Sequence, residues 1–166
     1  MNVTDPFEKI LKSYETYYDV NRDDPEPPFE AEAVFHSHDK QYFLMKSAKL
    51  GETESNEYVF FAKLDFLDTE RLKRLDKIAW EKGICRVKPH SNHRNTDIAL
   101  IIVSEQIEED AFSQISKISH YKSYRFGFQG WSHYRLIVLE TSSGHLTYNR
   151  QGQSLKELFD NIFQQK

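Results

Sequence analysis

The chain has 166 residues and carries 22 basic and 26 acidic side chains, for a formal net charge of −4 at pH 7. Apolar residues make up 39% of the chain and aromatic residues 14%, which excludes intrinsic disorder as a description of the whole chain and fits one folded domain. Because the charge balance is acidic, nothing draws the whole molecule toward nucleic acid or an anionic membrane, and neither is an expected partner.

The cysteine content and the hydropathy of the chain bear on its location. Cys85 is the single cysteine, so an internal disulfide is excluded. No basic and then apolar segment at the N-terminus resembles a signal peptide, and the longest apolar run, Ile98–Val103, is far shorter than the roughly 20 residues that cross a bilayer. We therefore expect a cytoplasmic protein without a membrane span.

The N-terminal part predicts a helix followed by an extended connector. Asp5 and Pro6 favour a helix start, and apolar side chains then recur at steps of three and four, which predicts a helix over residues 5–18. Residues 21–28 contain three prolines and cannot form a helix or a central strand. Since the residues before them are too few to fold alone, we interpret 21–28 as a connector within a single domain, whose α/β core begins at residue 30.

Three strand-like runs separated by polar turns follow the connector: residues 31–36, 41–47 and 57–64. Short connections favour antiparallel pairing, so these runs predict a three-stranded meander in that order. A helix should then start at Asp68 or Thr69 and stop at Gly83, a residue type that tolerates the left-handed conformation of a helix end.

The C-terminal half alternates strands and helices. Residues 97–104 are almost continuously apolar, which is typical of a central strand covered on both faces, and a polar surface loop at 88–96 precedes them. Apolar residues at helical spacing and turn residues predict the later elements. These are a helix at 108–119, a short strand at 121–128, a hairpin of 134–140 with 145–149, and a helix that begins with the capping box Ser154–Glu157. We therefore predict the α+β class (mixed α/β), with one mixed, mainly antiparallel sheet of about six strands and helices on both faces.

The predicted order of helix, three-stranded meander, helix and strand, over residues 5–104, resembles the core of restriction-endonuclease-like folds. The resemblance implies a divalent cation held by an aspartate of the second meander strand and by a Glu/Asp-x-Lys motif of the third. No Asp-x-Lys or Glu-x-Lys occurs in this chain. The charged residues that remain as a scattered substitute for the catalytic site are Glu32, Lys46, Glu57, Lys63 and Asp65. The alternative interpretation is that these are solvent-facing charges on strand edges.

Two sets of residues are candidate metal ligands. His36 and His38 are two residues apart on a predicted strand, which places both side chains on one face. Cys85, His90 and His93 form the second set, but their C-x4-H-x2-H spacing matches no standard zinc pattern. Neither set supplies the ligand count of a zinc site, so we expect polar turn residues and a packed thiol, with no bound metal and no cofactor.

Residues 121–135 form the most unusual segment, with six Phe, Trp and Tyr residues, three basic residues and two glycines. Two interpretations are open: a glycine-bent strand whose rings fill the core, or an exposed patch that contacts a partner. Aromatic rings interleaved with basic side chains also suit single-stranded nucleic acid. The residues of the candidate patch are Tyr124, Arg125, Phe126, Phe128, Trp131 and Tyr134.

The common catalytic signatures are missing from the sequence, including the phosphate-binding loop, the dinucleotide-binding loop, the serine-hydrolase elbow and the zinc-protease helix. We therefore expect a non-catalytic binding or regulatory module whose aromatic patch contacts a protein or a small molecule, and which is a monomer or a homodimer. A metal-dependent phosphodiester hydrolase and a single-stranded nucleic-acid binder are the two alternatives.

Overall fold

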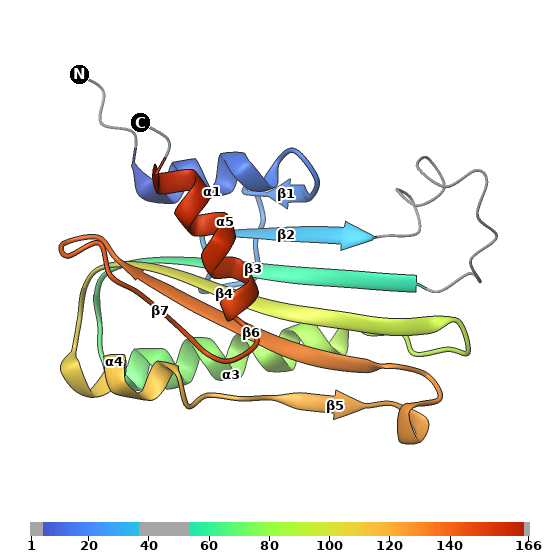
Figure 1. The fold of residues 1–166 in the computed structure, drawn as a ribbon. Coiled ribbons are helices and arrows are strands. Elements are labelled where there is room, and N and C mark those ends of the chain that lie inside the picture. The colour runs from blue at the N-terminus through green and yellow to red at the C-terminus, as the bar shows by residue number, and fades with distance from the viewer. Residues whose placement is uncertain (1–4, 37–53, 165–166) are drawn as a thin grey trace.

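Four α-helices flank one mixed sheet in the computed structural model, which describes residues 5–36 and 54–164 (Figure 1). The helices are α1 (Pro6–Tyr14), α3 (Thr69–Cys85), α4 (Glu109–Ile115) and α5 (Gln153–Gln164). The strands are β1 (Asp19–Asn21), β2 (Ala31–His36), β3 (Glu54–Leu67), β4 (His93–Ile107), β5 (Tyr121–Ser123), β6 (Trp131–Glu140) and β7 (Leu146–Tyr148). The predicted strand 41–47, which includes Lys46, and the candidate ligand His38 lie outside the described residues.

The seven strands of the described chain follow the order β1-β2-β3-β4-β6-β5, and β7 pairs with the second half of β6. β3, β4 and β6 are parallel to one another, and the other neighbouring pairs are antiparallel. This arrangement confirms the predicted fold class, a mixed, mainly antiparallel sheet with helices on both faces. Parallel neighbours require a crossover, and the chain passes through α3 from β3 to β4 and through α4 from β4 to β6.

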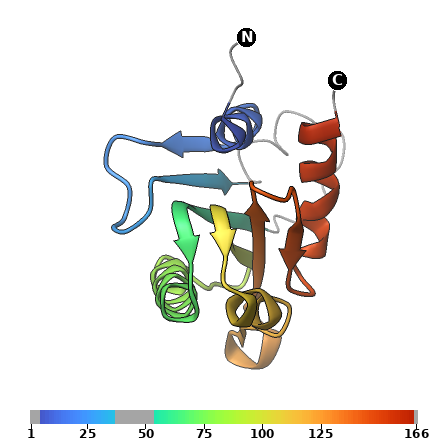
Figure 2. The same cartoon turned by 90° about the vertical axis from the view of Figure 1, so that its left-hand side faces the viewer.

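Side chains alternate between the two faces of the sheet, and each face has its own helical cover (Figure 2). Along β4, Ile101 belongs to the core under α1 and α5, whereas Leu100 and Ile102 belong to the core under α3 and α4. A strand covered on both faces can be apolar at every position, which explains the almost unbroken apolar run of β4. The same alternation determines whether a polar side chain at a strand end faces α1 and α5 or faces α3 and α4.

The first helix is shorter than the sequence predicted. α1 ends at Tyr14, and after one turn the chain forms the edge strand β1. Val20 of β1 pairs with Ala33 of β2, so the chain leaves the helix early in order to reach the sheet. The prediction of a helix over residues 5–18 was therefore wrong at its C-terminal end, because the aromatic periodicity beyond Tyr14 belongs to a turn. The predicted connector also starts later, since its first residue, Asn21, ends β1.

The predicted meander had the wrong strands. β2 pairs directly with β3, with Ala33 across from Val59, so the predicted strands 31–36 and 57–64 are neighbours in the sheet. The antiparallel meander consists of β1, β2 and β3 instead. Together with α1, α3 and β4, it gives a helix, three antiparallel strands, a helix and a strand, which is the predicted order of element types, although β1 was not among the predicted strands.

Helix α3 begins as predicted but ends later. Asp68 is its N-cap and accepts a hydrogen bond from the backbone N–H of Arg71 at 2.7 Å. The helix continues through Gly83, where a Cβ atom would lie 2.4 Å from a side-chain carbon of Ile98. This glycine therefore allows α3 to approach β4 closely and does not stop the helix. Cys85, at the end of α3, is exposed, contrary to the packed thiol that we expected.

The remaining boundaries differ by a few residues. β4 starts at His93, inside the predicted loop 88–96, while β5 and α4 are shorter than the predicted strand and helix. Ser154 lies within the first turn of α5 and donates a hydrogen bond to the carbonyl of Gln151, so the predicted capping box was wrong. The predicted hairpin of β6 and β7 is confirmed by their antiparallel pairing.

Candidate functional site

One end of the sheet collects most of the candidate functional residues. Because β3, β4 and β6 are parallel, their first residues meet at the same end, together with the last residues of the antiparallel β2. This end, on the right in Figure 1, also carries the loop between β5 and β6. We call it the polar end; it comprises residues 54–57, 93–97 and 124–135 and the end of β2.

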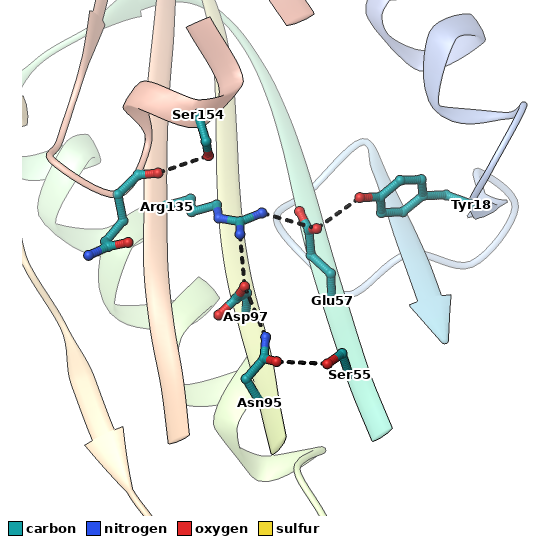
Figure 3. Close-up of polar contacts among 8 residues, drawn as sticks. Tyr18, Ser55, Glu57, Asn95, Asp97, Arg135 and Ser154 are labelled. Carbon is teal, nitrogen blue, oxygen red and sulfur yellow. Dashed lines mark hydrogen bonds and ion pairs between the residues drawn. The ribbon is translucent and has the colours of Figure 1, made fainter. Parts of the chain in front are cut away.

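Two carboxylates and one guanidinium meet on the face that α1 and α5 cover (Figure 3). Glu57 of β3 and Asp97 of β4 are partners in the strand register, and each is more than nine-tenths buried. Arg135 of β6 lies 3.3 Å from the Oε2 atom of Glu57 and 2.9 Å from the Oδ2 atom of Asp97, to which it donates. A single cation thus links three neighbouring strands.

Three further polar side chains complete this group, which we call the Arg135 cluster. The hydroxyl of Tyr18, which follows α1, donates to Glu57 Oε2 at 2.8 Å. Asn95 donates to Asp97 Oδ2 at 3.2 Å and accepts from the hydroxyl of Ser55 at 2.8 Å. The cluster therefore connects the turn after α1 to the starts of β3, β4 and β6, as Figure 3 shows.

The Arg135 cluster contains two acidic side chains but one basic side chain. Two carboxylates share one guanidinium, and the Oε1 atom of Glu57 and the Oδ1 atom of Asp97 are buried without a hydrogen-bond partner among the described residues. Burial raises the pKa of Glu57, although the charge of Arg135 and the hydrogen bond from Tyr18 oppose that shift. Burial and the negative charge of Glu57 also raise the pKa of Tyr18, so its hydroxyl stays protonated and donates.

The opposite face of the polar end holds a chain of hydrogen bonds that includes two of the candidate histidines. His36 Nδ1 donates to the Asn56 side chain at 2.8 Å, and Asn56 donates to Glu54 at 2.7 Å. His90 Nε2 lies 2.6 Å from the other oxygen of Glu54. The hydrogen bond from Asn56, followed by the one from His90, lowers the pKa of Glu54 despite its partial burial.

Among the candidate metal ligands that the structure describes, the rings of His90 and His93 lie near each other, with centroids 6.1 Å apart, but each histidine binds a different partner. His36 and His90 bind opposite ends of the Asn56 and Glu54 chain, while His93 donates from Nδ1 to the carbonyl of Gln129 at 2.6 Å. Across the two described stretches, no group of three or more His, Cys, Asp or Glu side chains is arranged to hold a metal ion.

The candidate catalytic residues are also dispersed. Glu32 faces the α3 side of the sheet and binds Arg86 at 2.6 Å, whereas Glu57 faces the α1 side. Lys63 forms an ion pair with Asp5 at the start of α1, and Asp65 is exposed. Of the candidates that the structure describes, Glu57 alone belongs to the Arg135 cluster.

The loop between β5 and β6 exposes two aromatic rings. We call residues 124–130 the aromatic loop. Its tip presents Phe126, which is 100% exposed, and Phe128, which is 83% exposed. Arg125 and Phe126 have φ angles of 48° and 55°, in the left-handed region that non-glycine residues rarely adopt. The tip therefore combines backbone strain with fully exposed apolar surface.

The base of the aromatic loop is anchored in the domain. Tyr124 is buried, and its hydroxyl is 2.9 Å from that of Ser132. His93, itself buried, donates to the Gln129 carbonyl and contacts the Tyr124 ring edge-on. Gly130 has a φ of +86° and packs so closely that a Cβ would lie 2.2 Å from the carbonyl oxygen of Arg94. The exposed rings are thus held on a loop whose ends are fixed.

The sequence-based patch becomes smaller in the structure. Arg125, Phe126 and Phe128 are exposed, Trp131 is half-buried, and Tyr124 and Tyr134 are buried. The segment therefore supplies core rings as well as surface rings. Sequence reasoning missed most of the Arg135 cluster: Tyr18, Ser55, Asn95, Asp97 and Arg135. A carboxylate at the start of a fully covered strand was the one available signal for Asp97.

Comparison with known proteins gives one match. The model of a family described as a Domain of unknown function (DUF8052) matches residues 3–161. No curated protein and no solved structure matches the chain. None of the helices in the described part of the chain is both long and apolar enough to cross a bilayer.

Proposed function

Since the chain belongs to the DUF8052 family, whose description assigns no activity, we propose from its geometry that the domain is a binding module that contacts a partner protein through the aromatic loop. We also propose that the domain acts in the cytoplasm, as expected from the sequence. The partner supplies an apolar surface that covers the rings of Phe126 and Phe128.

The exposure of these two rings on an anchored loop carries the proposal. Burying a phenylalanine side chain contributes roughly 1.5–3 kcal/mol, so both rings leave that free energy unused in the isolated domain. The left-handed conformation of Phe126 costs roughly 1–2 kcal/mol more. A strained, fully exposed phenylalanine is unfavourable for the domain alone and favourable for a domain that inserts it into a partner.

The shape of the loop favours a protein over a small molecule. Small-molecule sites are concave and surround most of their ligand. The aromatic loop is a tip that projects its rings outward, so a partner must surround the loop. Aromatic side chains that fill a pocket of the partner are the usual anchors of protein interfaces.

The Arg135 cluster has a supporting role in this proposal. Its polar side chains bind one another, and they fix the starts of β3, β4 and β6. β4 and β6 carry His93 and Ser132, which hold the base of the aromatic loop. The cluster thereby stabilises the strand ends from which the loop projects.

Site-specific photocrosslinking tests the proposal. A photoreactive phenylalanine analogue placed at position 126 should give discrete protein adducts in cells. The same analogue at Phe112, a partly exposed ring of α4, serves as the matched control and should not give these adducts. Identical adducts from both positions, or no adduct from position 126, would contradict the proposal, and adducts between two copies of the chain would identify a homodimer.

A further inference from the structure

Basic side chains are concentrated next to the aromatic loop. Residues 86–97 and 121–135 together contain six lysines and arginines and one acidic residue, Asp97, in a chain whose net charge is −4. Asp97 is buried and bound to Arg135, so it does not offset positive charge at the surface. The local charge is therefore opposite in sign to the charge of the whole chain.

The two basic segments are neighbours in the fold. Asn95 of β4 is the register partner of Trp131 of β6, and the hydrogen bond from His93 to Gln129 joins the segments again. The backbone carbonyl of Arg94 lies directly against the glycine that ends the aromatic loop. Both segments therefore contribute to the surface at the polar end.

Four of these cations are exposed and have no ion-pair partner within residues 5–36 and 54–164: Lys88, Arg94, Lys122 and Arg125. The other two are neutralised inside the domain, since Arg86 binds Glu32 and Arg135 binds the carboxylates of its cluster. Unpaired positive charge thus lies on the two segments that meet at the aromatic loop, which favours an anionic partner with apolar side chains.

The neighbouring strand offers a backbone edge. β5 ends the strand order of the sheet, and no strand of the described chain pairs with its outer edge. All three of its residues are exposed. An edge strand presents N–H and C=O groups that pair with an added strand of another chain, and a nucleic acid lacks that pattern.

Resting on the proposed function, we infer that the partner segment is an extended acidic peptide in which Asp or Glu side chains alternate with apolar ones. The peptide pairs with the outer edge of β5. Its carboxylates face Arg94, Lys122 and Arg125, and its apolar side chains cover Phe126 and Phe128.

Selection of random peptides displayed on phage, with the full chain immobilised, tests this inference. Enriched peptides should be rich in Asp and Glu beside apolar residues, and their affinity, measured by fluorescence anisotropy, should fall as salt is raised. Reversing three charges in Arg94→Glu, Lys122→Glu and Arg125→Glu should weaken binding at least about tenfold. The control reverses three exposed charges of α3 in Lys73→Glu, Arg74→Glu and Lys77→Glu, and should retain the affinity.

A second variant, Phe126→Ser with Phe128→Ser, separates this inference from the proposed function. If enriched peptides bind that variant as well as the wild type, or if nothing is enriched, both the proposed function and the inference are overturned. If binding needs the two rings but the peptides are not acidic, or the loop charge reversal equals its α3 control, the inference alone is overturned. Tighter binding of an oligothymidine that requires the same cations would assign the surface to single-stranded nucleic acid instead.

Discussion

Glu57 and Asp97 lie side by side on two parallel strands, and each keeps one buried carboxylate oxygen without a hydrogen-bond partner among the described residues. Their other oxygens share the guanidinium of Arg135. A pair of this kind depends strongly on its single cation, because removing one partner of a buried ion pair leaves the other without compensation.

Replacing Arg135 should therefore destabilise the domain. In Arg135→Met the two carboxylates remain buried without a cation, and we expect the free energy of unfolding to fall by about 3 kcal/mol at neutral pH. Urea denaturation followed by circular dichroism measures this change. The control Arg125→Met removes an exposed cation of the aromatic loop and should change the unfolding free energy by less than about 0.5 kcal/mol. Equal effects of the two variants would show that the cluster contributes nothing specific.

The raised pKa of Glu57 predicts a pH dependence with a definite sign. Since the folded state holds this proton more tightly than the unfolded state, ionisation of Glu57 reduces stability as pH rises from about 4 to 7. Glu57→Gln cannot ionise, so its unfolding free energy relative to wild type should improve over that interval. Urea denaturation at several pH values measures the difference, and a relative loss with rising pH would contradict the raised pKa.

Glu54 should give a pH dependence of stability opposite in sign to that of Glu57. Its pKa is lowered, mainly by the hydrogen bond from Asn56, so its ionised form stabilises the fold above the usual glutamate pKa of about 4. Glu54→Gln lacks this contribution, so its unfolding free energy relative to wild type should fall as pH rises from about 2 to 5 and should then stay constant up to pH 7. The same denaturation series, extended to acidic pH, measures it. Parallel pH trends in the two variants would rule out the assigned directions.

The strain at the tip of the aromatic loop predicts an unusual response to glycine. Phe126 has a φ of 55° and makes no buried contact, so Phe126→Gly should raise the unfolding free energy by about 0.5–1 kcal/mol. Phe128 is similarly exposed but has an ordinary φ of −66°, so Phe128→Gly should lower the unfolding free energy by about 0.5–1 kcal/mol. Thermal unfolding compares the two, and changes of the same sign would contradict the strain.

The anchor of the loop can be tested with a second pair of glycines. Both Gly130 and Gly127 have positive φ angles, but a Cβ on Gly130 would collide with the backbone of residue 94, whereas one on Gly127 would meet nothing within 4 Å. Gly127→Ala should therefore cost about 1 kcal/mol from backbone strain, and Gly130→Ala about 2 kcal/mol more. Chemical denaturation gives both values, and equal costs would mean that the loop base is not tightly packed.

Much of the fold could be predicted from local sequence patterns. The cap at Asp68, the apolar run that became β4 and the hairpin of β6 with β7 were all identified correctly. Each depends on residues within a few positions of one another, where capping, turn chemistry and side-chain periodicity act. The aromatic segment at 121–135 was also recognised, but which of its rings are buried was not.

The tertiary structure alone decided the pairing of β2 with β3 and the composition of the Arg135 cluster. Arg135 contacts Asp97 and Glu57, which precede it in the chain by 38 and 78 positions. These contacts exist because three parallel strands adopt one particular register. A shift of one residue in that register would turn Glu57 or Asp97 to the opposite face of the sheet. Local sequence preferences do not determine the strand register. The register is fixed when both helical layers pack onto the sheet and bury its apolar side chains.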